Sequence, residues 1–144
     1  MKSIILLITC LFATYLNAQD TIEAMLITSD RKKPIKEFYA LFEKIPQLRF
    51  SEVKQPKANE DIEQGLANNY DILIFYDLND SITSEQKAAY WNLLKSGKPM
   101  LFLHHTLVSY QDWPEFTKII GGKYFGDHPQ RGASTFEHNI NISV

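Results

Sequence analysis

The chain has 144 residues, enough for one domain, and 44% of them are hydrophobic, which is typical of a globular protein and excludes a disordered chain. The formal net charge of -2 gives no electrostatic basis for binding nucleic acid or an anionic membrane surface.

Residues 1–18 have the pattern of a secretory signal peptide. Lys2 supplies a positive charge, Ile4–Leu16 form an apolar segment that is short for a membrane span, and small residues follow it. We therefore expect an exported protein, periplasmic or extracellular, whose domain spans 19–144 and makes no membrane contact after cleavage. An uncleaved anchor and a lipoprotein signal are the alternatives. Because Cys10 is the single cysteine, the mature chain would have no thiol for a disulfide, a metal site or a nucleophile.

The first half of the domain alternates between strand and helix patterns. Thr21–Ser29 is mostly apolar and is predicted to be a strand, and Ile35–Ile45 has apolar residues at spacings of three and four, which predicts a helix. Leu48–Val53 alternates between apolar and polar residues, as in a half-exposed strand near a sheet edge. Lys54–Asp61 is predicted to be a polar linker, followed by a short helix over Ile62–Leu66.

The alternation continues in the second half. Asp71–Asp77 contains a continuous apolar run, which predicts a strand buried on both faces. Thr83 and Gln86 have the spacing of a capping box at the start of a helix, and Gly97 is predicted to end that helix. Met100–Leu103 is predicted to be a further buried strand, at the centre of the sheet.

After that strand, Asp112 is predicted to cap another helix that ends at Gly121-Gly122, and Phe136–Val144 alternates like a strand. This order predicts an α/β fold with a parallel sheet and helices on both of its faces. The chain ends inside its last predicted strand, so we expect the domain to be incomplete at its C-terminus. The glycine spacing of a phosphate-binding loop is absent, so nothing favours nucleotide binding.

The best candidate site is the pair His104 and His105, which directly follows the strand Met100–Leu103. Open α/β sheets bind ligands at the carboxyl ends of their strands. Imidazole serves there as a general acid or base, or as a metal ligand. If the strand continues through them, successive side chains alternate between its faces, and one of the two histidines would reach the site while the other packs against the fold. Two structural histidines are the alternative.

Asp77 ends the preceding strand at the same edge of the predicted sheet. If the two strands are neighbours, Asp77 can orient a histidine, accept a sugar hydroxyl or bind a metal. His128, in a later loop, is a further substrate-binding candidate, and His105, Asp77 and His128 are together the candidate ligands of a divalent metal such as zinc. The alternatives are an Asp that caps its own turn and an exposed, idle loop histidine.

Tyr110 and Trp113 flank the loop after the histidine pair. Aromatic rings beside polar groups suit stacking against a sugar ring, so both are candidate substrate-binding residues. The alternative for Trp113 is a hydrophobic contact that fixes the start of the next helix.

Several of these segments together resemble the ThuA-like, or trehalose-utilisation, family. The resemblance covers residues 22–144 and is strongest over 71–129. It is carried by seven segments of the sequence: Asp71–Asp77, Ser84–Gln86, Leu101–His105, Ser109-Tyr110, Asp112–Phe116, Ile120–Gly122 and Gly126–Pro129.

The resemblance implies a flavodoxin-like sheet of the class I glutamine amidotransferase type, and a role in the metabolism of trehalose or related disaccharides and their keto derivatives. In those amidotransferases a nucleophilic cysteine stands at the turn after a central strand. His104 and His105 occupy that place here, so glutaminase activity is not expected, and the fold alone does not carry the function.

We therefore expect an exported carbohydrate-active enzyme, hydrolase- or lyase-like, with His104 and His105 as its catalytic residues. Its expected partner is a small-molecule carbohydrate, without nucleic acid, and a homo-oligomer is left open. No cofactor other than the divalent metal is indicated. The alternative from a different class is a non-catalytic sugar-binding or partner-binding module of a secreted carbohydrate-utilisation system.

Overall fold

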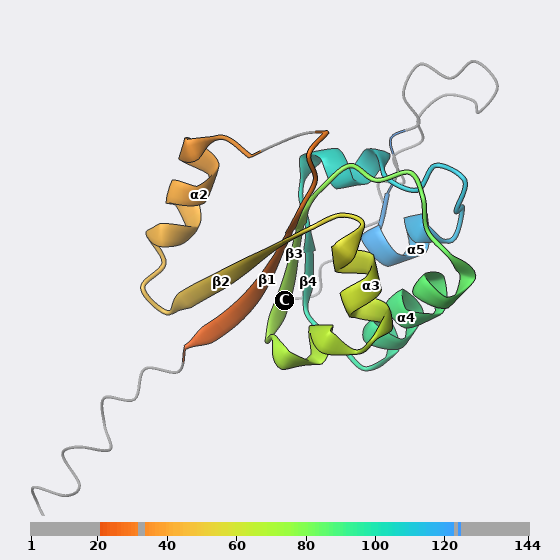
Figure 1. Ribbon diagram of the computed structural model, residues 1–144, viewed down its shortest axis with the longest axis horizontal. Helices are drawn as coiled ribbons and strands as arrows, with labels where there is room; N and C mark the ends of the chain where they lie inside the picture. The colour runs from red at the N-terminus through yellow and green to blue at the C-terminus, as the bar shows by residue number, and fades with distance from the viewer. Residues whose placement is uncertain (1–20, 32–33, 123, 125–144) are drawn as a thin grey trace, which may run out of the picture.

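The computed structural model describes residues 21–31, 34–122 and 124, and shows a parallel sheet between helices (Figure 1). The described sheet has four strands in the order β2-β1-β3-β4, and each neighbouring pair is parallel. This is the predicted α/β architecture, and the order is consistent with flavodoxin-like folds. The strands are β1 (Ile22–Thr28), β2 (Leu48–Lys54), β3 (Ile72–Tyr76) and β4 (Met100–Phe102).

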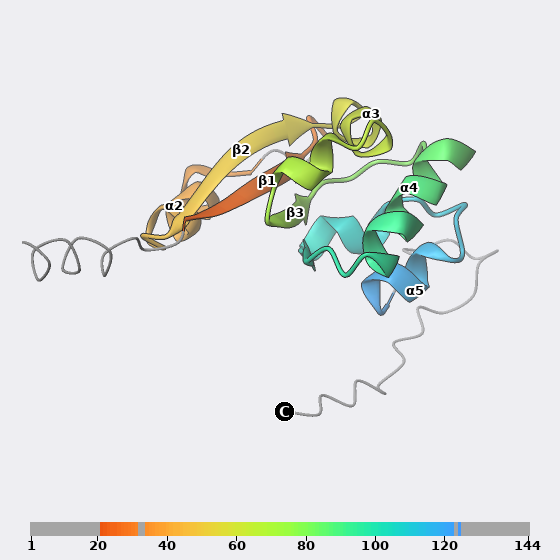
Figure 2. The same ribbon diagram turned by 90° about the horizontal axis from the view of Figure 1, so that it is seen from below.

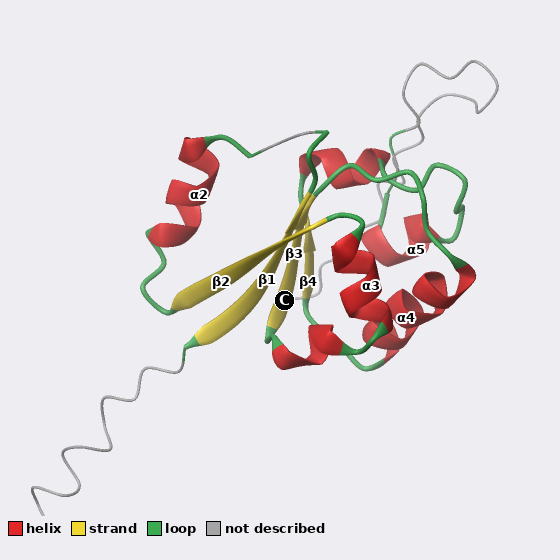
Figure 3. Ribbon diagram, viewed as in Figure 1, coloured by secondary structure: helices red, strands yellow, loops and turns green. Residues whose placement is uncertain are grey.

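Helices cover both faces of the sheet. Figures 1 and 3 show α2 on one side of the strands and α3, α4 and α5 on the other, and Figure 2 shows the same separation from below. Two short 3-10 turns, η2 and η3, precede β3 and follow β4. The helical elements are α2 (Lys36–Glu43), α3 (Lys57–Glu63), η2 (Leu66–Asn69), α4 (Ser84–Lys95), η3 (His104–Val108) and α5 (Phe116–Ile120).

The alternation of side chains along β1 divides the core in two. Met25 and Ile27 face the larger cluster, which α3, α4 and α5 complete, while Ala24 and Leu26 face the smaller cluster under Phe42 of α2. Each of these four residues is at most 1% exposed. Because β1 is covered on both faces, it is uniformly apolar at these positions, as expected for an inner strand of a parallel sheet.

The capping box at the start of α4 and the glycine after its end are as predicted. The Thr83 side chain accepts a hydrogen bond from the amide of Gln86, and the Gln86 side chain accepts one from the amide of Thr83, which completes the capping box. Gly97 follows the helix in the left-handed conformation, with φ +74°. β2 is an edge strand with alternating exposure, which confirms that prediction too.

The prediction of a linker over Lys54–Asp61 is wrong, because α3 already begins at Lys57. Ala58, Asn59 and Asp61 are buried in it together with Ile62. The polar composition of this segment indicated exposure, but α3 packs against α4, and its own polar residues Asn59 and Asp61 are buried.

The C-terminal part of the described chain differs from prediction in two respects. β4 lies at the edge of the described sheet, and Leu101 is 42% exposed, so the strand is neither central nor buried on both faces there. α5 begins at Phe116 with Glu115 as its N-cap residue and without a side-chain cap, so Asp112 does not cap it. The predicted signal peptide 1–18 and the predicted strand Phe136–Val144 lie outside the described residues.

Among the helices of the described segments, none is long and apolar enough to cross a bilayer.

Candidate functional site

The two adjacent histidines line one cavity at the carboxyl end of β4. β4 ends at Phe102, and His104 and His105 are the first residues of η3. Their rings are stacked, with centroids 4.0 Å apart and an interplanar angle of 19°. We call the space beside them the histidine cavity; its volume is about 350 Å³, and it is lined by His104, His105, Leu107, Val108 and Tyr124.

Both histidines reach the cavity because the strand does not continue through them. Strand geometry would send successive side chains to opposite faces, but a 3-10 turn starts at His104 and places both rings on one side. His105 is half-buried, and its ring meets that of Tyr76 at the end of β3, with centroids 5.5 Å apart and an angle of 63°. His104 is exposed. The expectation that only one histidine reaches the site is therefore replaced by a site that holds both.

His104 has an unusual backbone conformation, with φ +44°. In this left-handed region the Cβ atom of an ordinary residue crowds the following carbonyl oxygen, at a cost of roughly 1–2 kcal/mol. Tyr110 shares the feature, with φ +50°. Such conformations in non-glycine residues gather at functional sites, so the backbone of His104 independently marks the turn after β4.

Replacing His104 by Gly is expected to give a more stable protein than replacing it by Ala. Both changes remove the imidazole, but only Ala keeps the Cβ atom that is strained at φ +44°. Allowing for the greater freedom of Gly in the unfolded chain, the net difference in the free energy of unfolding is about 1 kcal/mol. Urea unfolding of the two variants measures it, and an Ala variant as stable as the Gly variant would contradict the assigned backbone strain.

Asp77 follows β3 and is fully buried beneath this edge of the sheet. β3 and β4 are neighbours, as the prediction for Asp77 required. The carboxylate does not line the histidine cavity, however. Its Oδ1 accepts a hydrogen bond from Thr106 Oγ1 at 2.9 Å, and its Oδ2 accepts one from Gln55 Nε2 at 2.9 Å. Asp77 therefore lies beneath the histidine turn rather than on the surface of the cavity.

Burial raises the pKa of Asp77 from 3.8 to about 6. The hydrogen bonds that the carboxylate accepts from Gln55 and Thr106, together with one from its own backbone amide, act in the opposite direction and favour the charged form. Desolvation outweighs them because the carboxyl group has no exposed surface. The charge of Asp77 thus changes in a range where ordinary aspartates are already ionised.

This pKa predicts that the protein loses stability as the pH rises. Below the unfolded-state value near 3.8 both states hold the proton and Asp77 costs nothing; as the pH passes 6 the folded state is forced to bury the charge. At about 1.4 kcal/mol per pKa unit, the loss is about 3 kcal/mol. The free energy of unfolding of the native protein should fall by that amount relative to Asp77→Asn between about pH 3 and pH 7.5. Parallel pH curves of the two proteins in urea unfolding would contradict this.

A network of buried polar side chains continues from Asp77 into the fold. Gln55 Nε2 also contacts Asn59 Oδ1 at 3.1 Å and the hydroxyl of Tyr110 at 3.2 Å. The hydroxyls of Tyr90 and Tyr110 each donate to Asn59 Oδ1 at 2.9 Å. Gln55 Oε1 and Asn59 Nδ2 are buried without a hydrogen-bond partner among the described residues. The protein's own polar groups therefore occupy the space at the carboxyl ends of β2 and β3, beside the histidine turn that follows β4.

Gln55 and Asn59 are not among the residues predicted for the site, because both lie in the predicted linker. One signal was available: Ala58 and Ile62 are four residues apart, the spacing of one helical face, with Asn59 beside them. The pattern is too short to predict a helix alone, and nothing local indicates that its polar members would be buried.

Tyr110 and Trp113 lie in the core rather than at the cavity. Tyr110 is 1% exposed and Trp113 is 3% exposed. The ring of Trp113 stacks on that of Phe116 in α5, with centroids 5.3 Å apart, and Tyr110 meets Phe116 edge-on at 4.9 Å. Their faces are covered by protein and are closed to a sugar ring in this conformation. The placement agrees with the alternative in which Trp113 fixes the helix that follows.

The candidate metal ligands are not brought together in the described part of the chain. Residues 21–31, 34–122 and 124 contain no group of three or more His, Cys, Asp or Glu side chains that could hold a metal ion. The carboxylate oxygens of Asp77 are engaged by Gln55 and Thr106. His128 lies outside the described residues.

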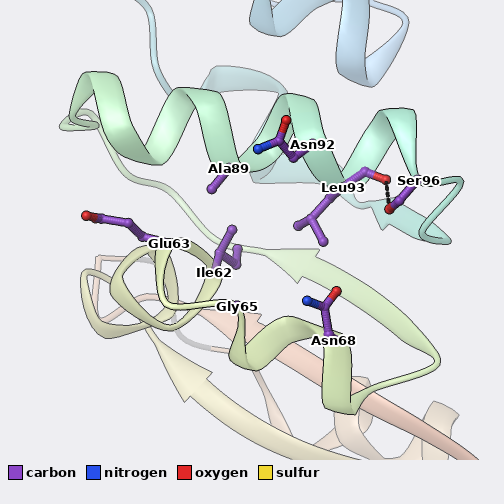
Figure 4. A pocket seen from close by; sticks show the side chains of 8 residues that line it. All are labelled: Ile62, Glu63, Gly65, Asn68, Ala89, Asn92, Leu93 and Ser96. Atoms are coloured by element: carbon purple, nitrogen blue, oxygen red, sulfur yellow. Dashed lines mark hydrogen bonds between the residues drawn. The ribbon is translucent and has the colours of Figure 1, made fainter.

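A second pocket, of about 280 Å³, lies between α3 with η2 and α4 (Figure 4). It shares no residue with the histidine cavity, and no histidine lines it. Asn68 and Ser96 precede β3 and β4, so this end of the pocket is at the amino edge of the sheet. Its lining residues are Ile62, Glu63, Gly65, Asn68, Ala89, Asn92, Leu93 and Ser96.

With this geometry established, the chain was compared with known proteins. It matches no protein-family model, no curated protein and no solved structure. What the fold itself supports is a parallel four-stranded α/β sheet of the kind found in flavodoxin-like folds.

Proposed function

We propose that this protein is an exported, ThuA-like enzyme of carbohydrate metabolism, and that His104 and His105 transfer protons to and from a sugar or glycoside in the histidine cavity. One observation carries the proposal: two stacked imidazoles face a single cavity at the carboxyl end of a strand in an open parallel sheet. Ligands of such sheets bind at this edge.

The lining of the cavity fits a small polyhydroxylated ligand. Its volume of about 350 Å³ lies at the lower end of the range for small-molecule pockets, about 300–1,000 Å³. The imidazoles supply hydrogen-bond donors and acceptors for the hydroxyl groups of such a ligand. Leu107, Val108 and the 43% exposed Tyr124 supply apolar surface for the C–H face of a sugar. Tyr124 thereby takes the stacking role expected of Tyr110 and Trp113.

The proposal includes neither glutaminase activity nor a metal at Asp77. The turn after β4 begins with His104 and His105, and Cys10 is the single cysteine of the chain, within the predicted signal peptide. A divalent metal such as zinc held by His105, Asp77 and His128 would require the Asp77 carboxylate to leave its hydrogen bonds with Gln55 and Thr106. The described residues thus favour acid/base chemistry by the imidazoles alone.

The test compares the native protein with the double variant His104→Ala, His105→Ala. Each is incubated with trehalose and with a keto-disaccharide, and products are followed by NMR. The native protein is expected to form product, and the double variant to form it at less than a tenth of that rate. Asn68→Ala, in the second pocket, is the matched control and is expected to retain full activity. A double variant with more than a tenth of the native rate would overturn the assignment.

A second candidate function is a sugar-binding module without catalysis. One observation favours it: no carboxylate is among the described residues that line the histidine cavity, whereas most glycosidases use a pair of carboxyl groups. This candidate predicts that the native protein broadens the NMR signals of the sugar but forms no product, and that the double variant loses the broadening.

A further inference from the structure

Asp77 and Thr106 form a reciprocal pair of hydrogen bonds across the edge of the sheet. Thr106 Oγ1 donates to Asp77 Oδ1 at 2.9 Å and accepts from the backbone amide of Asp77 at 3.3 Å. Both residues are completely buried. The single hydroxyl therefore uses its proton and one lone pair on the same partner, which fixes its position on two sides.

Thr106 is the residue of η3 that directly follows His105. In a 3-10 turn the backbone of three consecutive residues is tightly coupled. The amide of Thr106 donates to the carbonyl of Leu103 at 3.2 Å, so the turn closes around His104 and His105. A hydroxyl fixed at Thr106 therefore restrains the backbone from which both imidazoles project.

The partner carboxylate is itself held rigidly. Its Oδ2 accepts from Gln55, which follows the edge strand β2, so the carboxylate connects the ends of β2 and β3 with the turn after β4. A second tie lies further along: the amide of Asn79 donates to Ser109 Oγ at 3.1 Å, and the amide of Tyr110 donates to the carbonyl of Asn79 at 2.9 Å. The loop after β3 is thus tied to the far end of the turn by these contacts, and to the end that carries the histidines by Thr106 and Asp77.

We propose that Thr106 and Asp77 are positioning residues, and that their two hydrogen bonds set the orientation of His104 and His105 in the histidine cavity. This inference rests on the proposed function and deepens it, because it identifies what aligns the two imidazoles. Neither residue touches the cavity. The effect passes through the backbone of the turn, over one residue from Thr106 to His105.

The test uses the full chain and the NMR signals of the histidine rings, assigned by their loss in His104→Gln and His105→Gln. Thr106→Val keeps the shape of the side chain and removes the hydroxyl. It is expected to shift the ring signals of His105, because the ring changes its position against Tyr76 and His104. Thr106→Ser keeps the hydroxyl and is expected to return the signals to their native positions. Thr106→Ala, which leaves room for water at Asp77, makes the same test if the Val variant does not fold.

Ser109→Ala is the matched control. It also removes a fully buried hydroxyl, which accepts from the amide of Asn79 and donates to the carbonyl of Asp77 at the far end of the turn, but it leaves both hydrogen bonds between Thr106 and Asp77 in place. It is expected to leave the histidine signals unchanged. A folded Thr106→Val or Thr106→Ala variant with native histidine signals, or a Ser109→Ala variant with the same shifts as Thr106→Val, would overturn the inference.

Activity gives an independent readout. A small misplacement of reacting groups costs up to about 100-fold in rate, so Thr106→Val is expected to lower kcat by about 10- to 100-fold with KM changed little, and Thr106→Ser to restore kcat. If the native protein forms no product while the ring signals behave as described, the proposed function fails and the positioning role of Thr106 stands. If product forms but the ring signals do not change in the Thr106 variants, the positioning role of Thr106 is wrong and the proposed function stands.

Discussion

Replacing His105 by Gln is expected to lower kcat for the sugar substrate by about 10²–10⁴-fold, the range that a positioned acid or base contributes. The His105 ring is half-buried between the rings of His104 and Tyr76, so its place in the cavity is fixed before a ligand arrives. A general acid or base depends on such positioning. Gln keeps hydrogen-bonding capacity and similar size but cannot exchange a proton, so KM should change much less than kcat.

His104→Gln is the matched comparison, since it makes the same change at the adjacent residue of the same cavity. Its ring is exposed and is supported on one face by His105, so a smaller loss in kcat is expected. Steady-state kinetics of both single variants, with kcat and KM determined separately, measures the difference. Equal and less than tenfold losses in both variants would mean that neither imidazole takes part in the reaction.

The prediction from sequence succeeded where local patterns and tertiary packing agree. The segment of β1 is mostly apolar and that of β3 is a continuous apolar run, and both are inner strands of the described sheet, covered on their two faces. The capping box of Thr83 and Gln86 needs only residues three apart, and it formed as predicted. The position of His104 and His105 at a strand end followed from the end of the apolar run before them.

Prediction failed where a polar residue finds its partner far along the chain. Asn59 is 1% exposed, although the polar composition around it indicates exposure. It is buried because the hydroxyls of Tyr90 and Tyr110, 31 and 51 residues away in the sequence, donate hydrogen bonds to it. The stacking of the two histidines has the same origin. It depends on η3, which Thr106 ties to Asp77 across 29 residues. Periodicity within a short window contains no information on such contacts.

Tyr110 and Trp113 show a related limit. Aromatic rings beside polar residues suit both a sugar-binding surface and a core, and sequence alone does not distinguish the two. In the structure the rings of Tyr110 and Trp113 both pack against Phe116 of α5, which places them in the core. The loop that was expected to display the rings is folded inward instead, and the aromatic surface left at the cavity is that of Tyr124.

This role predicts that truncation of Phe116 strongly destabilises the fold. Its side chain is completely buried and lies against four aromatic rings, those of Tyr90, Phe102, Tyr110 and Trp113, with centroid distances of 4.9–6.3 Å. Phe116→Ala removes the ring and leaves a cavity that rigid aromatic neighbours cannot easily close. The free energy of unfolding is therefore expected to fall by about 3–5 kcal/mol. Urea unfolding of the native protein and the variant measures the loss.

Leu94→Ala is the control for Phe116→Ala, since it truncates an apolar side chain on neighbouring α4 that is 37% exposed. A partly exposed site buries less surface and leaves no closed cavity, so a loss below about 1 kcal/mol is expected there. Phe116→Leu retains most of the volume and should fall between the two. If Phe116→Ala costs no more than Leu94→Ala, α5 does not close the core. The segment after the histidines would then lack the anchor that holds Tyr110 against Asn59 and the polar network beneath the cavity.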